Sequence, residues 1–421
     1  METMVSAITE GALKDLFDPF DESLIVEPYA HYHRLRSEDP VHWSPLLRVW
    51  VLSRMEDVKN VLNDRNFEAV EATKYISELA RRAGRDYSSL IRVLDATLFY
   101  KEGPAHQKTR RTISKIITRI PLSQIKSIIN DIATLLSAKL STLFEYDAIA
   151  EFAEPLPHYV MAHILGLQKS DVRTLNDLLT QLTLMLDGCT LEVYDNINAK
   201  AGIALDLLQS RIAEAANSNA ESGLSDIYNG TSGSQSQRLA QAAATALFTY
   251  RVGAETTMAL VGFLIRALIE RPSLRQTIRD NPTFAQTAVS EVLRLESMVQ
   301  RALRVCTQAR VIGGKTIQPG DRVMLLLGSA NRDPAAFAAP DDLNIKQQAK
   351  PHVAFGGGHH YCVGASLAQL EGCIALEHLV KLPPIERAGD EKWYAGRSIR
   401  RLTYLPVRVV QNFGAVLDDV Q

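Results

Sequence analysis

The chain has 421 residues, of which 46% are hydrophobic and 22% are charged, and its formal net charge is −2. This near balance excludes the strongly basic or acidic composition of proteins whose main partner is nucleic acid or an anionic membrane surface. Four cysteines, none of them in a C-x-x-C pair, are too few for a disulfide framework and favour a reducing cytoplasm.

The N-terminal region indicates neither a secretory signal nor a membrane anchor. Residues 1–17 include acidic residues and have no basic segment before an apolar stretch, and we expect them to be flexible. The longest apolar run near the middle of the chain, residues 258–265, is far shorter than the roughly 18 residues that span a bilayer. We therefore expect a protein without a membrane partner.

In chain order, the first predicted element is a β-hairpin of residues 41–43 and 49–52. Residues 123–143 are predicted to form a helix, because Ile and Leu recur there at three- and four-residue steps after a start signal at Pro121 and Ser123. The same periodicity predicts helices over 154–167, 171–187, 193–216, 236–270 and 284–297. Short strands at 304–308, 309–312 and 322–327, with turns at 313–314 and 319–320, precede a last strand pair around 400–409.

This pattern indicates a mainly α fold with small β-sheets. Residues 217–237, which end in NGTSGSQSQ, have the composition of a surface loop or a domain boundary. The helix predicted after them is too apolar to lie anywhere but in a core. We see no internal repeat and predict a single domain over residues 1–421.

The most informative segment is HVAFGGGHHYCVGASLAQLE, residues 352–371. Glycines before and after Cys362 allow a tight turn and a close approach to a flat ligand, and an apolar helix begins at about Ala365. Backbone N–H groups and the helix N-terminus are expected to lower the pKa of the Cys362 thiol. Such a thiolate can be a nucleophile or a metal ligand. For the nucleophile, His359 and His360 are near in sequence, but nothing else completes a triad.

The segment matches every fixed position of F-G-x-G-x-H-x-C-x-G, the haem-binding signature of the cytochrome P-450 family, and the chain resembles that family from about residue 18 to 409. The resemblance implies the cytochrome P-450 fold, a large helical domain with small β-sheets. It implies haem b, with Cys362 as the iron ligand and Phe355 packed beside the sulfur. The matching residues are Phe355, Gly356, Gly358, His360, Cys362 and Gly364.

Other family landmarks follow by resemblance. Glu291 and Arg294 form the E-x-x-R ion pair, which we assign to folding. His106 and Arg110, four residues apart on one helix, together with Arg304 and His360, are implied to hold the haem propionates. The chain departs from the family at Gln347, Gln369 and Met298, where Arg, Arg and Pro are common.

The central helix carries the sequence RVGAETT, residues 251–257. By resemblance, Gly253 would leave a groove for dioxygen, and Glu255 and Thr256 would deliver protons during O–O cleavage. The alternative for Thr256 is a hydroxyl bonded to its own helix backbone.

Specificity in the family lies in residues near 68–100, 171–200, 298–303 and 396–399 and in the central helix. The candidate substrate residues are Arg251, Val252, Val299, Gln300 and Ser398. Arg251 can bind a substrate carboxylate or pair with Glu255 one turn away, and we slightly favour the pair.

The resemblance predicts a cytoplasmic, monomeric monooxygenase that inserts one oxygen atom of O2 into a small organic substrate, as a hydroxylation in biosynthesis or catabolism. Electrons from NAD(P)H would arrive through a separate ferredoxin or flavodoxin with its reductase, because no flavin or nicotinamide motif is visible. A basic stripe, Lys108, Arg111, Lys115 and Arg119, is either the docking patch for that carrier or a solvated face. The alternatives left open are a coupling, rearranging or peroxide-driven member, and, in another class, a haem-based sensor or carrier.

Overall fold

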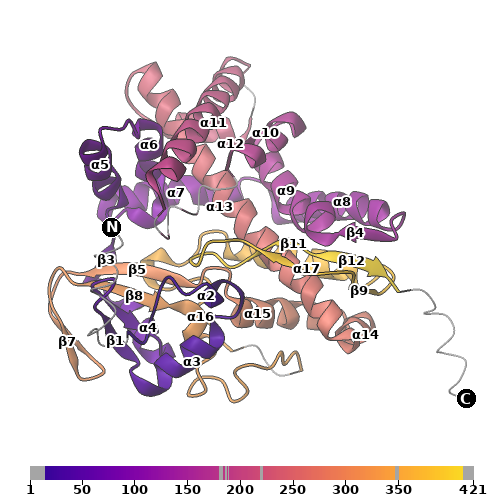
Figure 1. Ribbon diagram of the computed structural model, residues 1–421. Helices are drawn as coiled ribbons and strands as arrows, with labels where there is room; N and C mark the ends of the chain where they lie inside the picture. The colour runs from indigo at the N-terminus through magenta and orange to yellow at the C-terminus, as the bar shows by residue number, and fades with distance from the viewer. Residues whose placement is uncertain are drawn as a thin grey trace, which may run out of the picture.

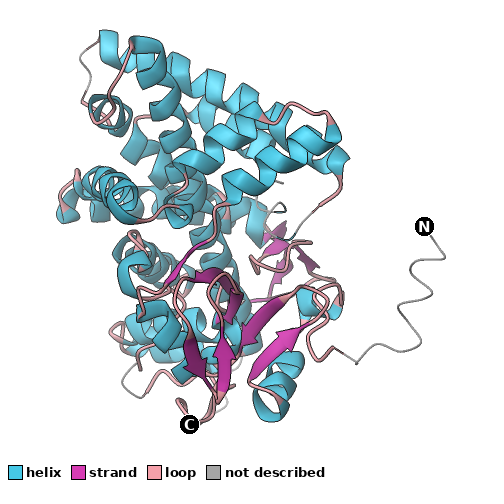
Figure 2. Ribbon diagram, turned by 90° about the vertical axis from the view of Figure 1, so that its left-hand side faces the viewer, coloured by secondary structure: helices cyan, strands magenta, loops and turns pink. Residues whose placement is uncertain are grey.

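The protein is described by a computed structural model for residues 15–179, 184, 187, 189–218, 221–346 and 350–410. Helices make up most of these residues, as predicted. In Figure 2 the upper part of the view is helical, and the strands lie in the lower part together with further helices. The helices are α2 Ser23–Val26, α3 Tyr29–Glu38, α4 Met55–Asn63, α5 Ala72–Ala83, α6 Ser88–Ala96, α7 Gly103–Thr118, α8 Leu122–Leu140, α9 Pro155–Leu165, α10 Lys169–Leu179, α11 Leu191–Asn217, α12 Gly223–Asn229, α13 Gln235–Glu270, α14 Pro272–Asp280, α15 Phe284–Glu296, α16 Leu327–Ala330 and α17 Ala365–Leu379.

The long helix α13 lies at the centre of the fold (Figure 1). It begins at a capping box, in which the side chains of Ser234 and Gln237 accept hydrogen bonds from each other's backbone N–H. Helices α6, α9, α11 and α17 pack around it. By length and composition α13 could cross a membrane, which the short run 258–265 did not predict, but 72% of its most apolar window is buried inside the protein. It is the core helix of the fold.

The principal sheet has the strand order β1-β2-β8-β5-β3. Its first two strands form the predicted antiparallel hairpin, and β2 and β8 are parallel. The strands are β1 Val41–Ser44, β2 Val49–Leu52, β3 Phe67–Ala69, β4 Glu145–Asp147, β5 Arg301–Cys306, β6 Arg310–Ile312, β7 Lys315–Ile317, β8 Arg322–Leu326, β9 Ile385–Arg387, β10 Lys392–Trp393, β11 Leu402–Tyr404 and β12 Pro406–Val409.

Two predictions of local structure were wrong. The strands near 400–409 do not pair with each other, because β11 pairs with β10 whereas β12 lies between β4 and β9. The segment 217–237 is not a continuous loop, because it contains α12. A capping box at Ser222 and Ser225 starts that short helix, and Leu224 and Ile227 are buried on one side of it.

The E-x-x-R pair lies in the interior. Arg294, of which 2% is exposed, donates to both carboxylate oxygens of Glu291 at 2.9 and 2.8 Å. It also donates to the backbone carbonyls of Asn331, Pro340 and Asp342. The guanidinium thus links α15 to the segment that leads to the cysteine loop. Gln347, which departs from the Arg common in the family, lies outside the described residues.

Candidate functional site

Cys362 lies in a tight loop between a short 3-10 turn, Gly358–His360, and α17. Its backbone N–H donates to the carbonyl of Phe355 at 3.0 Å. Gly356 and Gly358 have φ angles of 69° and 61°, which favour glycine, and a side chain on Gly358 would collide with the carbonyl of Leu62. The glycines predicted around the cysteine therefore let this loop close on itself and against α4.

The Cys362 thiol does not have the lowered pKa expected from the sequence. Burial raises its pKa, against the lowering effects of a hydrogen bond from the Gly364 N–H and of the Arg110 guanidinium. The reason is that desolvation penalises a bare thiolate more than the Gly364 N–H and the positive charge of Arg110 stabilise it. A sulfur in this environment is expected to ionise when a cation binds it directly.

The four candidate propionate residues converge beside this loop. The ring of His106 lies 4.5 Å from the ring of His360, and Arg110 donates from Nη1 to the carbonyl of Tyr361 at 2.7 Å. His106 is 3% exposed, and its Nε2 is buried without a hydrogen-bond partner among the described residues. Burial, and after it His360 and His359, lower the pKa of His106 to about 4. Arg304 is also buried and donates from Nη1 to the carbonyl of Leu303.

Glu102 is a member of this cluster that sequence reasoning missed. Its carboxylate oxygens lie 2.9 Å from Nε2 of His359 and 2.9 Å from Nε2 of His360, and one accepts the backbone N–H of Ala69 at 2.7 Å. Burial raises the pKa of Glu102, but these hydrogen bonds outweigh it and lower the pKa to about 2. The signal was its position at the start of the sequence EGPAHQKTRR, residues 102–111, directly before α7.

These residues fit a haem group. An isolated buried nitrogen such as Nε2 of His106, and a buried guanidinium such as Arg304, are unfavourable unless an acceptor meets them. Two propionates would supply such acceptors, while the cysteine loop beside them offers one sulfur to the iron. The donor set is therefore the one that iron protoporphyrin requires.

On α13, Thr256 and Gly253 make contacts within the protein. The Thr256 hydroxyl donates to the carbonyl of Val252 at 3.0 Å, the backbone bond that was its alternative reading. A Cβ on Gly253 would lie 2.6 Å from Sδ of Met161, so the missing side chain lets α9 approach α13. The dioxygen groove expected at Gly253 stays a prediction. Val252, one residue earlier, is 37% exposed.

Glu255 is buried and held by two arginines. Nη2 of Arg251 lies 2.7 Å from its Oε1, and Nε of Arg401 lies 3.2 Å from the same oxygen. Of the two roles considered for Arg251, the structure contains the pair with Glu255. Arg401 was not predicted, because it is 146 residues away in the chain.

Three of the other candidate substrate residues come together at a junction of two segments. Val299 forms an antiparallel bridge with Ile399, and the N–H of Gln300 donates to the carbonyl of Ser398 at 2.9 Å. The structure therefore brings Val299, Gln300 and Ser398 together, whereas Arg251 is paired inside the protein on α13.

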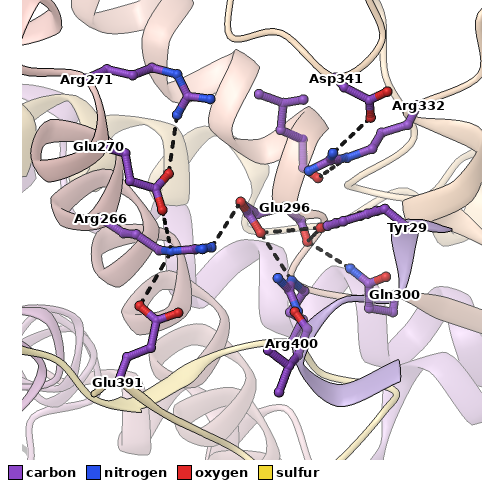
Figure 3. Close-up of polar contacts among 12 residues, drawn as sticks. Tyr29, Arg266, Glu270, Arg271, Glu296, Gln300, Arg332, Asp341, Glu391 and Arg400 are labelled. Carbon is purple, nitrogen blue, oxygen red and sulfur yellow. Dashed lines mark hydrogen bonds and ion pairs between the residues drawn. The ribbon is translucent and has the colours of Figure 1, made fainter. Parts of the chain in front are cut away.

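A charged network fixes one side of this junction (Figure 3). Nε of Arg400 lies 3.1 Å from Oε2 of Glu296, and Nη1 of Arg266 lies 3.7 Å from Oε1 of Glu296. Burial raises the pKa of Glu296, but Arg400, Arg332 and Arg266 outweigh it and lower the pKa overall. Arg400 also donates to the carbonyls of Ile25 and Val26. The network ties α13, α15 and α2 to the strand segment after Ser398.

Two residues of the basic stripe, Lys115 and Arg119, share one acidic partner within the protein. Nζ of Lys115 lies 3.0 Å from Asp226, and Nε of Arg119 lies 3.2 Å from the same carboxylate, on α12. Lys108 and Arg111 are exposed. Any docking patch on α7 is therefore smaller than the sequence predicted.

Comparison with known proteins gives a consistent result. The family described as cytochrome P450 matches residues 159–382. Cytochrome P450 109 of Bacillus spizizenii is 30% identical over 396 residues, covering 91% of this chain and 92% of the relative. The biotin biosynthesis cytochrome P450 of Bacillus subtilis is 28% identical over 371 residues, covering 87% of this chain and 91% of the relative.

Solved structures agree. P450BioI, crystallised with an acyl carrier protein ligated to hexadec-9Z-enoic acid, has a TM-score of 0.83 at 27% identity, covering 92% of this chain and 99% of its own. CalO2 has a TM-score of 0.84 at 25% identity, covering 94% and 98%. The helical fold with small sheets is therefore shared along most of each chain.

Proposed function

The chain belongs to the cytochrome P450 family, and from this premise we propose how its residues serve a haem-thiolate monooxygenase. Cys362 is the iron ligand, with Phe355, Gly356 and Gly364 shaping the loop around the sulfur. His106, Arg110, Arg304 and His360 hold the propionates. The observation that carries this assignment is the buried Nε2 of His106, which has no partner among the described residues although it lies beside the cysteine loop.

When bound, haem b with a thiolate ligand supplies the activation of O2, whose O–O bond the thiolate helps to cleave. The residues of α13 serve proton supply. Glu255, fixed between Arg251 and Arg401, is the internal acid, and the hydroxyl of Thr256, the next residue on the same turn, donates to Val252. Proton delivery requires that Thr256 exchange its backbone bond for a bond to water or substrate.

The enzyme uses a small-molecule substrate and redox partners. We propose that electrons from NAD(P)H arrive through a ferredoxin or flavodoxin and its reductase, which meet the exposed Lys108 and Arg111. A complementary acidic surface on the carrier would raise the association rate. We also propose a single catalytic domain over residues 1–421, a monomer and a cytoplasmic location.

The substrate is proposed to lie between Val252 on α13 and the junction of Val299, Gln300 and Ser398. The P450BioI structure contains an acyl chain on a carrier protein. A carrier-bound acyl chain is therefore a second candidate substrate form for this chain, beside a free small molecule.

The test is the carbon monoxide difference spectrum of the dithionite-reduced protein, beside a Cys362→Ala control. A strongly red-shifted Soret band that the control lacks is expected. A band at the position given by histidine or neutral thiol would contradict the assignment of Cys362. Turnover with a generic ferredoxin and reductase would then separate a monooxygenase from a haem sensor or carrier.

A further inference from the structure

The carboxylate of Asp187 is surrounded by donors from two distant segments. The backbone N–H of Arg397 donates to Oδ2 at 2.7 Å, and the N–H of Ser398 donates to the same oxygen at 3.2 Å. The Ser398 hydroxyl donates to Oδ1 at 2.6 Å, and the Arg301 guanidinium donates from Nη2 to Oδ1. Nε of Arg301 in turn donates to Oγ of Ser398 at 2.9 Å.

Successive backbone N–H groups, a hydroxyl and a guanidinium are together the donor set that recognises a carboxylate. We define these groups of Arg301, Arg397 and Ser398 as the carboxylate receptor. The side chains of Arg301 and Asp187 are 10% and 6% exposed, so the contact is largely shielded from water. Shielding makes such a charged contact stronger and more selective than a surface ion pair.

We propose that the carboxylate receptor anchors the substrate, that the substrate carries a carboxylate, and that this carboxylate displaces Asp187. The proposal rests on the monooxygenase function proposed above and names its substrate class. The residue expected to bind the substrate carboxylate is therefore Arg301 and not Arg251, which is paired with Glu255.

The position of the receptor supports this role. The carbonyl of Ser398 accepts the N–H of Gln300, and the Val299–Ile399 bridge lies directly beside it, so the receptor is built on the two proposed substrate segments. Arg301 and Arg304 are three residues apart on β5, about 10 Å at ~3.3 Å per residue. The receptor therefore lies on the same strand as Arg304, one of the residues proposed to hold the propionates.

Ion pairs outside the receptor fix the backbone segment that follows Ser398. Arg400 is fixed by Glu296, and Arg401 by Glu255, so the segment after Ser398 is anchored on both sides. A Cβ on Gly396 would lie 2.6 Å from the Tyr394 ring and 3.0 Å from Oδ2 of Asp187, and glycine thus lets the backbone approach the carboxylate. The donors should keep their positions when Asp187 leaves.

The Asp187 carboxylate can be displaced from the receptor for a physical reason. It lies in the connection between α10 and α11, 114 residues before Arg301, and among the described residues its hydrogen bonds are all with the receptor. Replacing it by a second carboxylate leaves Arg301 paired. The exchange therefore avoids a buried unpaired charge, the main penalty for breaking such a contact.

The first test uses the holoenzyme with Asp187→Ala and acetate as the probe. The variant should unfold at a lower temperature than wild type. Sodium acetate should raise the unfolding temperature of the variant towards that of wild type and reach a plateau, because a ligand that binds the folded state stabilises it. Acetamide at the same concentration should not raise the unfolding temperature of the variant. Adding Arg301→Gln to Asp187→Ala should abolish the effect of acetate. An acetate effect that survives Arg301→Gln, or no effect of acetate, would overturn the receptor.

The second test addresses exchange and uses Asp187→Asn, which preserves the volume of the side chain. Dodecanoate and its methyl ester are titrated into the ferric holoenzyme and followed by the Soret shift. The acid should bind about tenfold more tightly to Asp187→Asn than to wild type and more weakly to Arg301→Gln, while the ester should not distinguish them. Equal responses to acid and ester, or no binding of the acid, would overturn the exchange. A normal carbon monoxide spectrum in every variant separates this failure from failure of the monooxygenase assignment.

Discussion

Arg251 and Glu255 form a buried ion pair one turn apart on α13, with 2.7 Å between Nη2 of Arg251 and Oε1 of Glu255. Arg401, from the C-terminal segment, contacts the same oxygen at 3.2 Å. The two guanidinium groups hold the Glu255 side chain inside the protein, on the turn that also carries Thr256. The acid proposed to supply protons is thus positioned by residues from two different parts of the chain.

Removing one of these guanidinium groups should lower the stability of the folded protein. Arg251→Met is expected to lower the free energy of unfolding by about 3 kcal/mol, because it leaves a buried carboxylate with one partner fewer. It should also raise the yield of hydrogen peroxide per NAD(P)H consumed, since Glu255 loses its position. Chemical denaturation and peroxide assays measure the two effects, with Arg251→Lys as the matched control that retains the charge. Unchanged stability together with weaker binding of a carboxylate substrate would instead support the ligand role of Arg251.

The buried carboxyl of Glu371 on α17 should make stability depend on pH. Burial raises its pKa from 4.5 to about 8, and neither carboxyl oxygen has a hydrogen-bond partner among the described residues. A raised pKa means that the folded state binds the proton more tightly. The stabilisation is therefore complete below pH 4.5 and is lost as the pH rises towards 8, by on the order of 1.4 kcal/mol per unit.

Glu371→Gln should remove this dependence, so the variant should exceed wild type in unfolding free energy at pH 8. Glu377→Gln on the same helix is the matched control. Denaturation curves between pH 5 and pH 9 measure the difference. Parallel pH profiles for wild type and Glu371→Gln would show that the carboxyl is already ionised or partnered.

His106→Leu should affect the apoprotein and the holoprotein in opposite directions. The apoprotein should be as stable as wild type or more so, because a buried nitrogen without a partner is replaced by an apolar side chain. Haem retention should fall by about tenfold, equivalent to about 1.4 kcal/mol, because one propionate donor is lost. Thermal unfolding and haem transfer to a competing apoprotein provide the two readouts, with Gln107→Leu as the exposed neighbour. Equal haem retention in both variants would remove His106 from the site.

Reversing charge on α7 should separate the free part of the basic stripe from the paired part. Lys108→Glu with Arg111→Glu is expected to slow reduction by an acidic ferredoxin about tenfold at low ionic strength, with the difference fading as salt rises. Lys115→Glu should instead lower stability, because Lys115 contacts Asp226 of α12. Stopped-flow reduction measures the rates, with Arg173→Glu on α10 as the control. Equal rates in all variants would place the docking patch elsewhere.

The sequence by itself determined the helices, loops and ion pairs that are formed by residues close together in the chain. The helices appear in the apolar periodicity, and the observed α8, Leu122–Leu140, differs from the predicted 123–143 mainly at its end. The cysteine loop could be predicted from the sequence because its glycines, Phe355, His360 and Cys362 lie within ten consecutive residues. The E-x-x-R pair is equally local, since residues three apart on a helix share a face.

Only the tertiary structure decided which distant groups meet. Arg401 reaches Glu255 across 146 residues, and Arg301 reaches Asp187 across 114. Asp226 of α12 contacts both Lys115 and Arg119 of the basic stripe. The sequence predicted strands at β11 and β12 but not the strands with which they pair. Every residue type offers the same backbone N–H and C=O groups, so the sequence does not show which strands pair. Local patterns arise from short-range periodicity and turn geometry, whereas the pairing of charges and strands depends on how the whole core packs.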